Sequence, residues 1–478
     1  MLFNTPVFLV FLAIVFPVAY FSKGRFKKSF LLACSYLFYG YWDWRFCSLL
    51  LISTAVDYSI GRRLGKTEEP RVRKRLVALS LCTNLGILGF FKYFNFFVDS
   101  FERAFAMQGP AFDYLHINVI LPVGISFYTF QTLSYTIDVY RKRMQPTHSL
   151  LDFSLFVAFF PQLVAGPIER ARSLLPQISK LPRATPQQIE AGIVLIAIGM
   201  FKKVMIGDAA GRFVDHIFAE PGEYLSFELV TALILFSVQI YADFSGYTSI
   251  ARGTGKLLGI DLMENFRQPY FSANLTEFWR RWHISLSQWL RDYLYIWGLG
   301  GNRRGARRTY VNLMITMLLG GLWHGANWTF VVWGGLHGVG LAAHRYFLRG
   351  RRIEERFSYR NPSQLVSYLA RVLLTNAFVL FAWLFFRSPD FETAAYILGA
   401  IVDWQPSELT GRFAGIAMTF VGMIWIIDFF EYYTKKPDFL VLLPSAWRYG
   451  IVSSVSLFTL LYIVRHAGTP MPFIYFQF

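Results

Sequence analysis

Residues 318–338 read LLGGLWHGANWTFVVWGGLHG, an apolar stretch that carries two histidines and one amide. These polar side chains belong to His324, Asn327 and His337. Polar groups at membrane depth are costly, and they usually face a cavity, a proton path or a substrate. The glycines of the stretch lack a Cβ, so backbone or ligand can approach closely there. A tightly packed helix pair with one satisfied histidine is the competing interpretation.

The composition is that of a membrane protein. Of the 478 residues, 54% are hydrophobic, 18% are aromatic and 16% are charged, and the mean hydropathy is +0.38. A soluble chain would carry charge on about a quarter of its residues. Apolar runs recur from end to end, so we expect residues 1–478 to form a single all-α polytopic domain. Its expected parts are N-terminal spans in 1–250, a catalytic segment in 251–345 and C-terminal spans in 346–478.

The placement of the basic residues argues against nucleic acid, despite a net charge of +17. Lysines and arginines cluster in short loops between apolar runs, at residues 23–28, 62–75 and 141–143. Such clusters mark cytoplasmic loops and favour contact with anionic membrane lipid. The same asymmetry places residues 252–308 in the cytoplasm and both termini outside.

Eleven or twelve transmembrane helices are expected, together with re-entrant and interfacial helices. Runs of about twenty apolar residues are long enough to cross a membrane. Residues 117–140 predict a helix kinked at Pro122 and Gly124, because irregular backbone is tolerated where it lines a cavity. Prolines break residues 152–168, which we expect to re-enter from the cytoplasmic side. Three runs are nearly featureless and are expected to be scaffold, at 365–386, 413–430 and 451–465.

A second polar stretch, YADFSGY, lies inside the apolar run of residues 229–250. No neighbour in sequence neutralises Asp243, so a distant cation or hydrogen-bond donor is implied. Asp243 and Tyr247 are therefore candidate substrate-binding residues. An ordinary carboxylate at the cytoplasmic interface is the alternative interpretation.

Residues 276–293, TEFWRRWHISLSQWLRDY, predict one amphipathic helix at the headgroup plane. Asn274 or Thr276 can cap this helix. His283 lies between Trp282 and Ser285, and all three are candidate site residues. The alternative interpretation is that this helix is an ordinary interfacial anchor.

Arginines in and after this helix could attract the phosphates of a donor, because guanidinium offers a fixed fork of hydrogen-bond donors. The candidates for this role are Arg280, Arg281, Arg303 and Arg304.

The motifs resemble those of the membrane-bound O-acyltransferases, and most of all the bacterial alginate O-acetyltransferase type. The two histidine stretches carry the resemblance, with support from LPVGISFYTF, FFPQLVAGPIER, FKKVMIGD and YADFSGY. The resemblance implies that His324 of LWHG is the catalytic histidine and that His283 is the second functional one. It also implies a ring of helices around a thin core, with a funnel from outside and a donor tunnel from the cytoplasm.

The chemistry of the residues fits acyl transfer independently of that resemblance. Transfer from a thioester needs a base or a nucleophile, and imidazole serves as either near neutral pH. We expect His324 to take the proton from the acceptor hydroxyl or from a partner protein's serine, with Trp323 and Asn327 beside the substrate. A transient acetyl-imidazole is the less favoured variant. Asn327 is expected to hold the imidazole ring or to bind the oxyanion, and its alternative role is to satisfy a backbone group. The sequence shows no metal-ligand spacing, so no metal is expected.

The expected donor is cytoplasmic acetyl-CoA or another acyl thioester, and the expected acceptor is an exported bacterial polysaccharide such as alginate. A periplasmic or extracellular acetyltransferase partner is expected to complete delivery at the inner membrane. Acetylation of peptidoglycan or cellulose and D-alanylation of teichoic acid remain open within the enzyme class. A transporter or flippase with a histidine path is the other class, and the lack of an internal repeat disfavours it.

Overall fold

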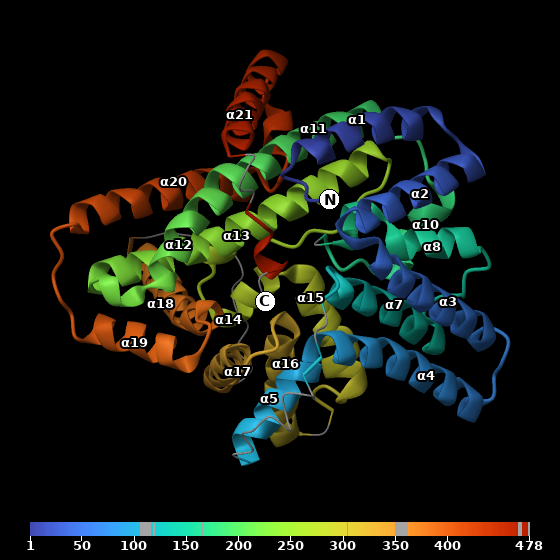
Figure 1. Ribbon diagram of the computed structural model, residues 1–478, viewed down its shortest axis with the longest axis horizontal. Coiled ribbons are helices and arrows are strands. Elements are labelled where there is room, and N and C mark those ends of the chain that lie inside the picture. The colour runs from blue at the N-terminus through green and yellow to red at the C-terminus, as the bar shows by residue number, and fades with distance from the viewer. Residues whose placement is uncertain are drawn as a thin grey trace. The chain divides into compact units, whose positions relative to one another are not determined.

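All regular elements in the part of the chain that the structure describes are helical, as the composition predicts. The computed structural model describes residues 1–105, 116–117, 120–164, 166–303, 305–348, 362–466 and 471–476. The helices (Figure 1) group into two compact units. Unit 1 comprises Met1–Ile193 and Ala251–Met263, and unit 2 comprises Val194–Ile250 and Glu264–Phe478.

Five helices among the described residues are long and apolar enough to cross a membrane. They are Pro70–Phe105, Ser226–Leu257, Pro362–Arg387, Thr410–Thr434 and Ser445–Arg465. Each contains a run that the sequence predicted as a span. Two shorter apolar helices, Pro6–Phe21 and Phe391–Val402, accompany them. The total of eleven or twelve spans stays a prediction.

Unit 1 consists mainly of helices of about ten to twenty residues. They are α1 (Pro6–Phe21), α2 (Gly24–Asp43), α3 (Cys47–Leu64), α4 (Pro70–Leu88), α5 (Phe94–Phe105), α7 (Ile125–Tyr140), α8 (Leu150–Ala158), α9 (Phe160–Leu163), α10 (Ala171–Lys180) and the start of α11 (Pro186–Met200). The predicted kinked helix over 117–140 is wrong, because α7 begins only at Ile125. Gly124 has a φ of +76°, and a Cβ there would come within 2.7 Å of the Leu163 carbonyl. The predicted break within residues 152–168 is confirmed by the gap between α8 and α9.

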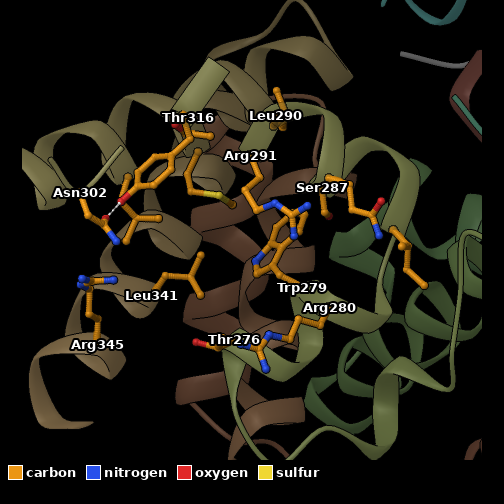
Figure 2. Close-up of a pocket in the computed structure, with 15 residues that line it drawn as sticks. Thr276, Trp279, Arg280, Ser287, Leu290, Arg291, Asn302, Thr316, Leu341 and Arg345 are labelled. Atoms are coloured by element: carbon orange, nitrogen blue, oxygen red, sulfur yellow. Dashed lines mark hydrogen bonds between the residues drawn. The ribbon is translucent and has the colours of Figure 1, made fainter. Parts of the chain in front are cut away.

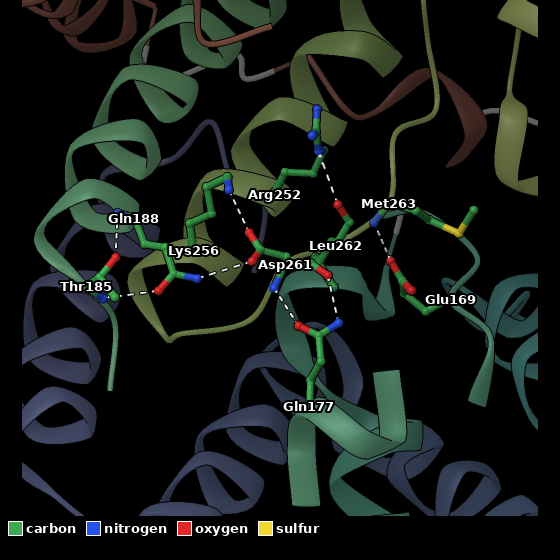
Figure 3. A network of polar contacts seen from close by, with 9 residues as sticks. All are labelled: Glu169, Gln177, Thr185, Gln188, Arg252, Lys256, Asp261, Leu262 and Met263. Atoms are coloured by element: carbon green, nitrogen blue, oxygen red, sulfur yellow. Dashed lines mark hydrogen bonds and ion pairs between the residues drawn. The ribbon is translucent and has the colours of Figure 1, made fainter. Parts of the chain in front are cut away.

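Polar contacts fix the segment that follows α13 (Ser226–Leu257) to α10 and α11 (Figure 3). The backbone N–H of Asp261 donates to Gln177 Oε1 at 2.9 Å. The Met263 N–H donates to the buried carboxylate of Glu169 at 2.6 Å. Burial raises the pKa of Glu169 to about 7. The network therefore sets the point at which the chain leaves unit 1 and begins ENFRQPY.

Unit 2 carries both histidine motifs. After α11 its elements are η3 (Phe201–Asp208), α12 (Ala209–Ala219), η4 (Pro221–Glu223), α13, η5 (Pro269–Phe271), α14 (Leu275–Arg281), α15 (Ile284–Trp289), η6 (Leu290–Gly298), α16 (Ala306–His324), α17 (Trp328–Leu348), α18 (Pro362–Arg387), α19 (Phe391–Val402), α20 (Thr410–Thr434), η7 (Phe439–Leu442), α21 (Ser445–Arg465) and η8 (Ile474–Phe476). The π-helix η3 packs very closely on α13. A Cβ on Gly207 would lie 2.9 Å from the backbone nitrogen of Asp243, so this glycine permits the approach.

Candidate functional site

The hairpin of α16 and α17 presents His324 at the end of its first helix. Two contacts define the turn. A Cβ on Gly321 would lie 2.2 Å from the Phe330 carbonyl, which confirms that a glycine here allows close backbone approach. Asn327 Oδ1 accepts from the Thr329 N–H at 3.1 Å and so caps α17.

The predicted single helix over 276–293 is wrong, because the chain turns sharply at His283. That residue has a φ of +40°, a left-handed conformation that side chains with a Cβ rarely adopt. Asn265, in the non-helical segment that follows α13, holds this turn through hydrogen bonds. Its backbone carbonyl accepts from the Ile284 N–H at 2.9 Å, and its side-chain oxygen accepts from Ser285 Oγ at 2.6 Å. The turn re-aims the histidine that a straight helix would have placed on its surface.

Both histidines reach one buried space. Their ring centroids lie 6.3 Å apart, and the side chains are 0% and 3% exposed for His283 and His324. Burial lowers the pKa of His283 to about 3, so its ring is neutral at physiological pH. Trp323 and Trp333 each lie 5.0 Å from the His324 ring and exclude water from it.

Tyr475 completes this space, and sequence reasoning missed it. Its ring lies 5.3 Å from the His324 ring and 6.4 Å from the His283 ring. The tyrosine hydroxyl is buried and makes no hydrogen bond to any described residue. The aromatic run FIYF after the last apolar run was the available signal.

Helix α18 also contributes, so the expectation that its run is mere scaffold is wrong. Phe386 lies 5.4 Å from the His324 ring, and Trp383 stacks on Trp333 at 5.6 Å. Both α18 side chains are almost fully buried.

The cation that the sequence implied for Asp243 is Lys203, whose Nζ lies 2.9 Å from Asp243 Oδ1. Lys203 lies in FKKVMIGD, one of the stretches that carry the family resemblance, and the sequence assigned this lysine no role. Tyr247 lies one turn further along α13, and its ring packs on Phe473 at 4.7 Å.

Three other predicted residues make structural contacts. Asn327 Nδ2 donates to the Pro389 carbonyl at 2.7 Å, which is the backbone-satisfying role expected as its alternative. Ser285 is bound to Asn265 as described above, and Trp282 is fully buried and stacks on Phe278 at 5.6 Å.

A cavity of about 430 Å³ opens within unit 2, beside α14, α15 and α16 (Figure 2). Among the described residues, the wall includes three arginines and no acidic residue: Arg280, Arg291 and Arg345. Apolar side chains including Trp279 and Met317 form much of the remaining wall. The Trp279 Nε1–H donates to His337 Nδ1 at 3.2 Å, which ties the cavity wall to α17.

Of the three described arginines that were predicted to attract donor phosphates, Arg280 alone lines this cavity. Arg281 is instead paired with Glu277 at 2.5 Å and lies over the Tyr432 ring. Arg303 is exposed and is not part of the cavity wall, and Arg304 lies outside the described residues.

Comparison with known proteins gives a consistent assignment. Residues 31–384 match the family model of the membrane-bound O-acyltransferases. The chain is 42% identical to a protein of Pseudomonas syringae pv. tomato named probable alginate O-acetylase, over 86% of this chain and 77% of the relative. It is 36% identical to the peptidoglycan O-acetyltransferase of Helicobacter pylori, over 84% of this chain and 80% of the relative. It is 30% identical to the teichoic acid D-alanyltransferase of Bacillus subtilis, over 58% and 71%.

Proposed function

The chain belongs to the membrane-bound O-acyltransferase family, and we propose that it moves an acetyl group from cytoplasmic acetyl-CoA through the inner membrane for O-acetylation of an exported polysaccharide such as alginate. The observation that carries the proposal is the buried meeting of the two histidine rings with the ring of Tyr475. The transporter interpretation finds no support in this family.

His324 is the proposed general base, and the hydroxyl of Tyr475, whose ring lies 5.3 Å from the His324 ring, is the proposed first acceptor. His324 takes the hydroxyl proton as the tyrosine oxygen attacks the thioester carbonyl. The carbonyl carbon gains a C–O bond and loses its C–S bond. The proton then passes from the imidazole to the departing thiolate sulfur, so the base is regenerated.

An ester on tyrosine suits onward transfer. A phenol has a pKa of about 10 and a thiol of about 8.5, so the two are comparable leaving groups. The acetyl group therefore keeps most of its transfer potential when it moves from sulfur to Tyr475. A periplasmic or extracellular acetyltransferase partner is proposed to take it from there to the polymer.

The cavity beside α14 is the proposed donor site. Its volume falls in the range of about 300–1,000 Å³ typical of small-molecule sites. Three guanidinium groups line the cavity, of which Arg291 is also paired with Asp292 at 2.7 Å, and such a group of arginines suits the phosphates of acetyl-CoA. The apolar wall then suits the pantetheine arm.

Replacing two of these arginines, as Arg280→Gln with Arg345→Gln, should raise KM for acetyl-CoA about a hundred-fold. The estimate takes at least 1.5 kcal/mol, about ten-fold, for each lost charged contact. Because the phosphates do not react, kcat should change little. Steady-state kinetics in detergent would measure both. Arg303→Gln is the matched control, since Arg303 is exposed and outside the cavity. An equal rise in KM in this control would show that the cavity is not the donor site.

The acceptor is tested by chemical analysis of the exported polymers. A strain lacking this protein should lose O-acetyl esters from one polysaccharide, and the native chain should restore them. Retention of all O-acetyl groups, or loss of D-alanine instead, would reject the proposed acetylation. Peptidoglycan and teichoic acid must both be analysed, because relatives of this chain are named for modifying them.

Both termini are proposed to lie outside, with residues 62–75 and 252–308 in the cytoplasm. Arg71 is exposed at the start of α4, so an Arg71→Cys side chain should react with a membrane-impermeant thiol reagent only after the cells are opened. Labelling of that cysteine in intact spheroplasts would contradict the proposed topology and indicate the opposite orientation.

A further inference from the structure

Lys203 and Asp243 form a buried ion pair in unit 2. Their side chains are 1% and 4% exposed, and Lys203 also pairs with Asp208 at 2.5 Å. Burying charges costs several kcal/mol per ion, so a buried pair is weak evidence for a role in stability. The role of the pair is therefore sought in the hydrogen bonds that Lys203 and Asp243 make to other parts of the chain.

Each member of the pair also binds the backbone of the same short segment. The Ile474 N–H donates to Asp243 Oδ2 at 2.8 Å, and Lys203 Nζ donates to the Pro472 carbonyl at 3.5 Å. The two backbone groups lie on either side of one residue, so the pair holds the segment at two points. Hydrogen bonds to ionised groups are stronger than those between neutral groups.

Side-chain packing continues this attachment along α13. Phe473 is fully buried, and its ring lies 5.5 Å from the Phe244 ring, next to Asp243 in sequence. The Tyr475 ring lies 4.8 Å from the same Phe244 ring. The hydrogen bond from Ile474 to Asp243 and the Phe473–Phe244 contact thus lie directly before Tyr475 in the segment, and the Tyr475–Phe244 contact orients its ring.

We propose that the Lys203–Asp243 pair is a latch that holds the backbone of residues 472–474 and thereby positions the Tyr475 side chain beside His324. The inference rests on the acceptor role proposed for Tyr475. It makes Asp243 a positioning residue, in place of the substrate contact predicted from sequence. Acetyl-CoA binds at the arginine-lined cavity, so the latch acts on kcat and leaves the donor KM unchanged.

Asp243→Asn in the full chain tests the latch, because it keeps the side-chain size and removes the charge. Hydrogen exchange at the Ile474 amide should become about ten-fold faster or more, the effect of weakening one charged hydrogen bond. The kcat for acetyl transfer should fall by a similar factor. Ser249→Ala is the control, because it lies on the same helix but six positions away and so on another face; it should change neither quantity.

A second variant leaves the ion pair untouched. Ile474→Pro removes the donating N–H from the segment side, and its ring also fixes φ at residue 474 and restricts Phe473. Ile474→Val is the control for the change in the buried side chain. The proline variant should lower kcat as Asp243→Asn does, whereas the valine variant should keep it near the native value.

The two readouts separate the latch from the proposed function. Unchanged exchange at Ile474 in Asp243→Asn would overturn the latch, whatever happens to transfer. Faster exchange with a native transfer rate would overturn the acceptor role of Tyr475, and the positioning role with it. A raised donor KM would show that Asp243 acts on the donor and would also overturn the proposal.

Discussion

His324→Gln is expected to abolish detectable acetyl transfer. Loss of a general base typically costs about a hundred- to ten-thousand-fold in rate. Glutamine keeps hydrogen-bonding capacity at this position and cannot accept the proton. The side chain is buried among Trp323, Trp333 and Phe386, so water has little access to replace the base. Acetyl-CoA turnover by the purified chain measures the effect.

Folding of the variant must be checked separately. His324→Gln should purify in the same yield as the native chain and should bind acetyl-CoA with native affinity, because the arginine-lined cavity is intact. Near-native turnover by this variant would exclude both the base and the nucleophile roles of His324. The histidine would then be a packing residue, as the competing interpretation of the sequence held.

Tyr475→Phe is expected to be nearly as damaging, because it removes one oxygen atom and keeps the ring. The ring contacts with Phe244, His283 and His324 all involve the aromatic face or edge that phenylalanine retains. The hydroxyl makes no hydrogen bond to a described residue, so its loss should leave the fold stable. Polymer acetylation in cells should therefore fall to background while the thermal midpoint of the purified protein stays within a few degrees.

The paired control for this prediction is Phe473→Leu. That substitution disturbs the packing of the same segment on Tyr247 without removing a hydroxyl. It should lower activity only partly, since the latch through Ile474 remains. Equal activities of the Tyr475→Phe and native chains would show that the acceptor hydroxyl comes from elsewhere.

The sequence predicted features that local chemistry sets. Asn274 caps α14 as expected, accepting from the Glu277 N–H at 2.9 Å. A buried carboxylate without a neighbouring charge required a distant cation, and Lys203 confirms it for Asp243. The close backbone approach predicted for the glycines around His324 is confirmed at Gly321, where a Cβ would lie 2.2 Å from the Phe330 carbonyl.

The features that were missed depend on contacts between residues far apart in sequence. Helical periodicity favoured one helix over 276–293, but hydrogen bonds from Asn265 override it and hold His283 in a left-handed conformation. Tyr475 lies about 150 residues from His324, and no periodic pattern links them. The arginines of the cavity come from three separate elements, so only Arg280 was identified beforehand.

The most direct test of the account is the mass of the peptide that contains Tyr475. Purified protein would be incubated with isotopically labelled acetyl-CoA, digested under mildly acidic conditions and examined by mass spectrometry. A labelled acetyl ester is expected on Tyr475 in the native chain, and no labelled ester is expected in His324→Gln. Labelled polymer without any ester on Tyr475, at the earliest times of a reconstituted reaction, would contradict this expectation.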